Sequence, residues 1–149
     1  MTHHLSAQRF RKTVALLLIL LWAYSAFDKV SGFAKFRLEL GKSPLLTGWE
    51  YGVAVLVPLA EFSTAVLLTF TRTTLLGLYL SFTLLSLFTA YLVVILNYSY
   101  YIPCSCNGLM ESMSWQAHIV FNTLSLIVTA SAIMINDHVK EKGGVLSVT

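Results

Sequence analysis

The chain has 149 residues, of which 56% are hydrophobic and 11% are charged, and its mean hydropathy is +0.73. Soluble domains carry about 25% charged residues, so this chain cannot give a globule a water-soluble surface. The composition excludes an ordinary cytosolic enzyme, a disordered chain and a nucleic-acid-binding domain, although the net charge is +3. It predicts a single membrane domain over residues 1–149, with the lipid bilayer as its environment.

Long stretches without charged residues divide the chain into hydrophobic segments. A helix needs about 20 mostly apolar residues to cross the bilayer core. We expect spans at roughly residues 11–30, 51–71, 73–97 and 115–136. These spans predict an all-α fold, an integral membrane four-helix bundle. The short link at 71–74 predicts that the second and third spans form an antiparallel hairpin.

The first span has two interpretations. A basic N-terminus followed by a Leu-rich run is typical of a first transmembrane helix, which we favour. It is also typical of a signal peptide, with Ala23-Tyr24-Ser25 as the cleavage site. At the outer end of this span, Asp28 and Lys29 are expected to pair locally or to anchor the loop that follows.

The connection between the first and second spans predicts a short amphipathic helix. Phe33, Phe36 and Leu40 recur at helical spacing, and Gly41 stands where a C-cap glycine is expected, shortly before Pro44. We expect this helix on the periplasmic surface of the membrane. There it would serve either as a lid over the bundle or as a docking surface.

Lys and Arg in the connections indicate the orientation of a membrane protein, because they favour the cytoplasmic side. We expect both termini to be cytoplasmic and the 98–114 loop to be periplasmic, in a bacterial inner membrane. The cytoplasmic side then carries Arg9, Arg11, Lys12, Arg72, Lys140 and Lys142, and the outer side carries Lys29, Lys35, Arg37 and Lys42.

Cys104 and Cys106 are the only two cysteines, and they lie in the outer loop before the fourth span. A disulfide between them closes a very small ring and is strained, and strained disulfides tend to be labile or catalytic. It would add little stability, because the loop that it closes is so short. The pattern favours a pair of catalytic thiols that exchange electrons with a partner, which makes the chain a candidate thiol–disulfide oxidoreductase.

Two other interpretations of the cysteines stay open at this point. Met110, Met113 and His118 follow the pair, and thiolate, thioether and imidazole together suit Cu(I). The spacing matches no tight metal template, so we assign no metal site. The cysteines could equally form a structural disulfide or remain inert thiols.

Ionisable groups inside a membrane are costly and point to function. Glu61 lies near the middle of the second span, three residues after Pro58. We expect it to meet the polar face of the fourth span, either as part of a proton or quinone path or through interhelical hydrogen bonds. Glu61, His118 and Asn122 are therefore the supporting site residues, and a quinone is the one candidate cofactor. The polar face consists of His118, Asn122, Ser125 and Thr129.

These motifs, in this order, resemble the MauE/DoxX family of small four-helix bacterial membrane proteins. The resemblance covers about residues 13–136. The part most similar to the MauE branch is Cys104-Ser105-Cys106-Asn107-Gly108, a C-x-C-x-G element, followed by Trp115, His118, Phe121 and Asn122. Earlier matching elements are Phe27-Asp28-Lys29, Gly32-Phe33-Ala34-Lys35-Phe36 and Pro58-Leu59-Ala60-Glu61. The resemblance implies a redox-associated inner-membrane protein, whose namesake is linked to maturation of a periplasmic, disulfide-rich methylamine dehydrogenase subunit.

The leading functional hypothesis is therefore thiol–disulfide exchange through Cys104 and Cys106, with His118 favouring the thiolate. One cysteine pair provides no second relay, so a periplasmic thioredoxin-like protein or a substrate protein is the expected partner. The alternative is a non-catalytic structural or assembly subunit, associated with other membrane subunits of a larger complex. A third hypothesis is metal handling.

Overall fold

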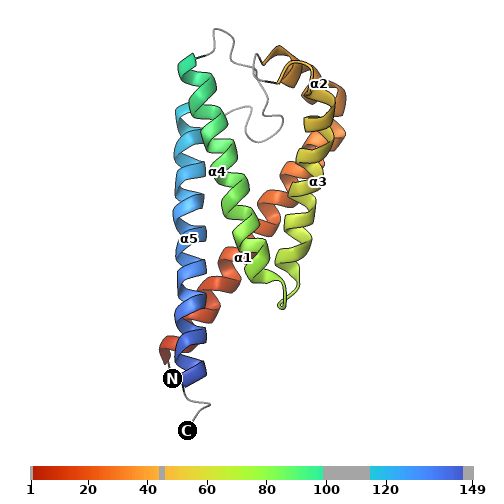
Figure 1. Ribbon diagram of the computed structural model, residues 1–149. Coiled ribbons are helices and arrows are strands. Elements are labelled where there is room, and N and C mark those ends of the chain that lie inside the picture. The colour runs from red at the N-terminus through yellow and green to blue at the C-terminus, as the bar shows by residue number, and fades with distance from the viewer. Residues whose placement is uncertain (1, 44–45, 99–114, 146–149) are drawn as a thin grey trace.

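The computed structural model describes residues 2–43, 46–98 and 115–145, and within these ranges it contains five helices and no strand (Figure 1). Four helices are long and apolar enough to cross a membrane, over Ala7–Ser31, Glu50–Thr69, Thr74–Asn97 and Gln116–Ile135. The predicted membrane four-helix bundle is confirmed. The helices are α1 (Thr2–Ser31), α2 (Phe33–Lys42), α3 (Glu50–Thr69), α4 (Thr74–Tyr98) and α5 (Trp115–Val145).

The long helices run alternately up and down the bundle. α1 packs mainly against α3, α3 continues into α4, and α4 packs along α5. One end of the bundle, which we call the turn end, carries the start of α1, the α3–α4 turn and the end of α5 (Figure 1). The opposite end, the α2 end, carries α2, the end of α4 and the start of α5. Both terminal helices therefore emerge on the same side of the bundle.

The turn between α3 and α4 is short and closely bonded. The amide of Thr73 donates to the carbonyl of Phe70 at 3.0 Å, and the Thr73 hydroxyl donates to the carbonyl of Leu67 at 2.8 Å. Just beyond it, α4 approaches α3 so closely that a Cβ on Gly77 would lie 2.8 Å from Cγ of Leu68. The hairpin predicted from the short link is confirmed.

Buried apolar side chains form two clusters rather than one continuous core. The larger cluster lies towards the turn end and draws on α1, α3, α4 and α5. The smaller cluster joins α2 to α3 at the α2 end, through Phe36, Leu40 and Ala54. The larger cluster consists of Val14, Ala15, Leu18, Trp22, Ala65, Leu68, Leu78, Leu85, Ala132 and Ile133.

The predicted amphipathic helix is present as α2, but its surroundings differ in part from the expectation. Phe36 and Leu40 are buried against α3 instead of facing the membrane alone, so α2 packs onto α3 at the α2 end. Gly41 lies inside α2 rather than after it. The C-cap residue is Ser43, whose extended backbone ends the helix and whose amide donates to the carbonyl of Leu40.

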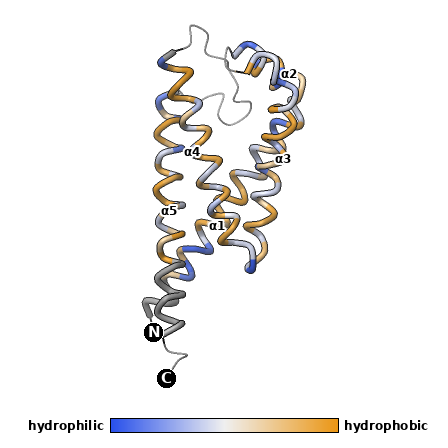
Figure 2. The backbone as a smooth tube through the Cα atoms, in the orientation of Figure 1, coloured by the Kyte–Doolittle hydropathy of each residue, from blue (hydrophilic) through white to orange (hydrophobic). Residues whose placement is uncertain are grey.

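The outward faces of the spans are apolar, whereas several polar side chains are buried. Leu16, Leu59 and Leu124 are among the many large hydrophobic side chains on the surface, and Glu61, Ser81 and Thr129 are fully buried. Figure 2 shows hydrophobic residues along the middle of each long helix, with hydrophilic residues mainly towards the ends. This arrangement suits a bundle whose solvent is lipid, because lipid tails accept apolar side chains directly.

Candidate functional site

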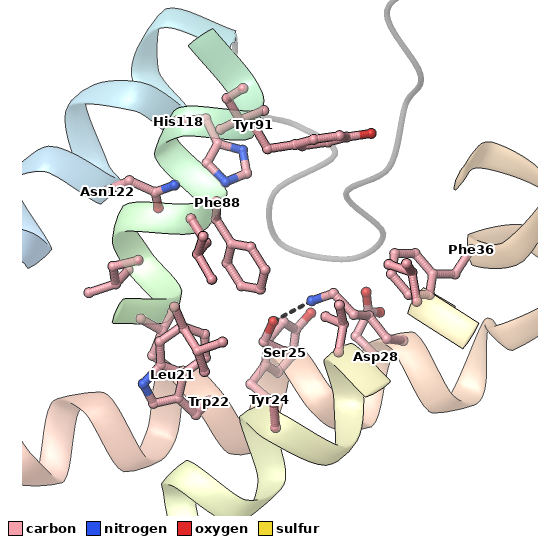
Figure 3. Close-up of a pocket in the computed structure, with 18 of the residues that line it drawn as sticks. Leu21, Trp22, Tyr24, Ser25, Asp28, Phe36, Phe88, Tyr91, His118 and Asn122 are labelled. Atoms are coloured by element: carbon pink, nitrogen blue, oxygen red, sulfur yellow. Dashed lines mark hydrogen bonds between the residues drawn. The ribbon is translucent and has the colours of Figure 1, made fainter. Parts of the chain in front are cut away.

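The most deeply buried charge of the described residues is in an ion pair that joins α1 to α3. The side chain of Glu61 has 0% exposure, and its Oε1 lies 2.9 Å from Nζ of Lys29. The hydroxyl of Ser25 donates to the same oxygen at 3.0 Å, and Lys29 Nζ donates to Ser25 Oγ at 2.6 Å (Figure 3). Three polar groups thus form a closed network within the apolar interior.

The sequence of α1 explains how Lys29 reaches Glu61. Leu18 and Trp22 are buried at helical spacing on the inner face of α1, and Ser25 and Lys29 continue that face towards the α2 end. On α3, Pro58 and Glu61 are both buried within one turn of each other. Pro58 has no amide hydrogen, so it removes one backbone hydrogen bond from the helix just before the acid.

The Lys29 ammonium also contacts aromatic rings from two other helices. It lies 5.8 Å from the ring centroid of Phe36 on α2 and 6.0 Å from that of Phe88 on α4. Both distances are within the range of cation–π attraction. The ion pair is therefore held by contacts that involve α1, α2, α3 and α4 together.

A cavity of about 740 Å³ lies next to this network, between the two apolar clusters. Its walls are mostly aliphatic and aromatic, and all five described helices contribute to them. The volume falls within the range of about 300–1,000 Å³ that small-molecule sites occupy. The polar residues of the lining are Tyr24, Ser25, Asp28 and Lys29 of α1, Tyr91 of α4, and His118 and Asn122 of α5.

The three supporting residues predicted from the sequence lie in this region, but in a different arrangement from the expected one. His118 and Asn122 are buried and line the cavity from α5 (Figure 3). Within the described residues, both hydrogen bonds that Glu61 accepts come from α1 rather than from α5. Lys29 belongs to both groups, since it binds Glu61 and lines the same cavity as His118 and Asn122.

The lower part of the polar face makes no interhelical hydrogen bond among the described residues. The Ser125 hydroxyl donates to the carbonyl of Phe121, and the Thr129 hydroxyl donates to the carbonyl of Ser125, both within α5. Thr129 is buried, whereas Ser125 is half-buried. The expectation of hydrogen bonds from these hydroxyls to other helices is thus wrong, because each satisfies itself on its own helix.

Lys29 is the residue that sequence reasoning placed wrongly. We expected it to pair with Asp28 or to anchor a loop, but its ammonium is inside the bundle with Glu61. A signal for this existed, because Ser25 and Lys29 extend the helical spacing of the buried face of α1.

Cys104, Cys106, Met110 and Met113 lie outside the described residues. In the part of the chain that the structure describes, no cluster of three His, Cys, Asp or Glu side chains could hold a metal.

The sequence matches the family described as methylamine utilisation protein MauE over residues 7–135. The chain belongs to the MauE family. The family match covers the four spans, α2, the ion pair and every described residue of the cavity. The resemblance of its motifs to MauE is confirmed, and the protein is a multi-pass membrane protein of this family. No curated protein and no solved structure was found to match the chain.

Proposed function

We propose that this MauE-family protein exchanges thiol and disulfide electrons with an exported protein through Cys104 and Cys106. The supporting observation is where the two helices that flank these cysteines end and begin. α4 ends at Tyr98 and α5 begins at Trp115, so residues 99–114 are attached to the bundle at the α2 end. That is the end with the cavity, His118 and the buried ion pair.

The exchange proceeds through a mixed disulfide. The thiolate of one cysteine attacks a disulfide of the partner, forms a new sulfur–sulfur bond and releases one partner thiolate. The second cysteine then attacks the mixed disulfide and releases the other partner thiolate. The pair ends as a disulfide and the partner as a dithiol, so two electrons have moved, and the reverse sequence oxidises the partner. His118, in the first turns of α5, would favour the thiolate.

The charge distribution suggests the side of the membrane on which the exchange takes place, and the family name suggests the class of substrate protein. The basic residues at the start of α1 and Arg72 lie at the turn end, which favours a cytoplasmic turn end. Because Lys29 is inside the bundle, the excess of basic residues on that side is larger than the sequence alone indicated. The α2 end then faces the periplasm across the inner membrane, where disulfides persist. The substrate class is an exported, disulfide-rich protein of methylamine utilisation.

The decisive experiment is to trap the mixed disulfide. Single variants Cys104→Ser and Cys106→Ser are isolated from membranes after acid quenching and alkylation, and adducts are identified by mass spectrometry. We expect one single variant to accumulate an adduct with a cysteine-containing exported protein, because the resolving thiol is missing. The double variant C104S/C106S is the control and should trap nothing. The absence of adducts in both single variants, with full maturation activity in the double variant, would refute the proposal.

A second experiment tests the orientation. Intact cells with a permeabilised outer membrane are treated with a membrane-impermeant maleimide. The Cys106→Ser variant, whose one thiol is Cys104, should be labelled. A Thr71→Cys variant in the C104S/C106S background is the matched control at the turn end, and it should be labelled only after lysis. Labelling of the Thr71→Cys variant but not of the Cys106→Ser variant in intact cells would invert the proposed topology.

A further inference from the structure

The cavity has a lining that suits one kind of molecule, a flat amphiphile from the bilayer. Rings of Trp22, Phe36, Phe88 and Phe121 contribute to its walls. Leu20, Leu56 and Leu87 line the cavity and are also exposed at the surface of the spans. The cavity is therefore bordered by residues that face lipid, so a long apolar tail attached to a bound head can extend into the bilayer.

The side-chain amide of Asn122 lines this cavity and has no hydrogen-bond partner among the described residues. Its side chain is 4% exposed, and its amide makes no hydrogen bond to any residue that the structure describes. Polar groups in a protein interior almost always have a partner. Figure 3 shows the amide directed towards His118 and Phe88, at the cavity wall. An acceptor inside the cavity would satisfy it.

Lys29 supplies a second donor from the opposite helix. Its ammonium has three N–H groups, and the described residues account for two of them, through Ser25 Oγ and Glu61 Oε1. Lys29 lines the cavity from α1, whereas Asn122 lines it from α5. A ligand that accepts hydrogen bonds from both Lys29 and Asn122 needs one acceptor on each of two sides. The rest of its head must be compact and apolar, because the cavity walls are.

The proposed exchange adds a chemical requirement. The chain has two cysteines in all, so it holds no second pair to receive electrons from the first. A membrane-soluble carrier of two electrons would close the cycle. A quinone has two carbonyl acceptors on a flat ring and an apolar tail, and it carries two electrons.

We propose that the cavity binds the head of a membrane quinone, with its carbonyl oxygens accepting hydrogen bonds from Asn122 and Lys29. The electron-transfer part of this inference rests on the proposed function, and the binding part does not. In the direction in which the pair oxidises a partner dithiol, Cys104 and Cys106 are left as a dithiol, which then loses two electrons and two protons and forms the sulfur–sulfur bond again. The quinone gains the same two electrons and two protons and leaves as the quinol. No other oxidant is required.

Trp22 provides a direct probe of binding, because it lines the cavity and quinones quench indole fluorescence. The full-length protein in detergent carries Trp49→Phe and Trp115→Phe, so that Trp22 is the remaining tryptophan of the three. It is titrated with decylubiquinone, and we expect saturable quenching. Asn122→Leu should weaken the apparent affinity about tenfold, as the loss of one hydrogen bond predicts. Asn122→Ala makes the same test if the leucine variant does not fold.

Asn97→Leu is the matched control, because Asn97 is exposed and its amide donates to the carbonyl of Val93 on its own helix. Its titration should equal that of the parent protein. Decylbenzene, which has the chain but no carbonyls, should not compete. Quenching that does not saturate, equal competition by decylbenzene, or unchanged affinity in folded Asn122→Ala and Asn122→Leu proteins would overturn the proposal and leave a lipid-filled cavity.

The titration is repeated in the C104S/C106S variant to separate this inference from the proposed function. We expect unchanged affinity there, since the thiols do not contribute to binding. Binding in a protein whose cysteines trap no partner would uphold the cavity site and refute the thiol exchange. Trapped partners without quinone binding would uphold the exchange and refute the cavity site.

Discussion

The two ends of this bundle are built in opposite ways. At the turn end, α3 and α4 meet at the close contact of Gly77 with Leu68, and the larger apolar cluster fills the interior. At the α2 end, the five described helices enclose a cavity, with a buried acid, a buried asparagine and a half-buried lysine beside it. Unfilled volume and buried polar groups both cost stability. The difference indicates that the turn end contributes most of the packing that holds the bundle together, and it fits the use proposed for the cavity at the α2 end.

The largest expected effect is at the ion pair. Lys29→Met leaves Glu61 buried without its charge partner, which typically costs about 3–5 kcal/mol. Glu61→Gln should cost less, because Lys29 is 19% exposed and its long side chain can move towards the surface. The free energy of unfolding is measured by SDS titration in mixed micelles. The double variant K29M/E61Q should be more stable than K29M.

Lys42→Met is the matched control for this comparison. Lys42 forms an ion pair with Glu39 at 2.7 Å, but its side chain is 49% exposed, and exposed pairs contribute about 0–1 kcal/mol. Equal losses from Lys29→Met and Lys42→Met would mean that burial of the Lys29–Glu61 pair has no energetic consequence.

The next largest effect is expected at the turn end. Gly77→Ala places a Cβ within 2.9 Å of Leu68 atoms, including its backbone nitrogen. The helices must separate to accommodate it, which should cost about 1–3 kcal/mol. Gly52→Ala is the control, since a Cβ there meets nothing within 4 Å. Because alanine is the better helix former, Gly52→Ala should be neutral or stabilising by up to about 1 kcal/mol. Equal destabilisation by both variants would contradict close packing at the turn end.

The smallest effect is expected at the boundary between the two ends. Trp22 belongs to the larger cluster and also lines the cavity, and its Nε1 donates to Ser81 Oγ at 2.9 Å. A double-mutant cycle of Trp22→Phe and Ser81→Ala should give a coupling energy near ~0.6 kcal/mol, the average for hydrogen bonds between membrane helices. Zero coupling would show that this contact does not join α1 to α4. Trp49→Phe, at an exposed tryptophan, is the control.

The fold could be predicted well because its signal is strong and local. Four apolar stretches are long enough to cross a membrane and predicted the four spans, and the spacing of Phe33, Phe36 and Leu40 predicted α2. The helices α1 and α5 extend nine residues beyond the expected spans, to Thr2 and Val145, and the limits of α3 differ by one or two residues, because the sequence has no sharp capping signal there. The end of α2 was missed for the same reason, since Gly41 resembled a C-cap but the helix continues to Lys42.

The candidate site could be predicted only in part. Glu61, His118 and Asn122 were found because polar residues inside spans are rare. Their partners were not found, because which faces meet depends on how the helices pack, and one sequence does not specify that. Lys29 looked like an ordinary span-end charge, and only the rotation of α1 brings it to Glu61. The cavity is a property of packing between five helices, and no local pattern predicts it.

The central claim is that Cys104 and Cys106 change redox state together. Differential alkylation in isolated membranes measures this directly, with a light reagent before reduction and a heavy reagent after it. The account predicts that a pulse of reductant exposes both thiols in the same molecules, and that both become protected again when the reductant is removed. Thiols that never change state, or two cysteines that label independently of each other, would contradict it.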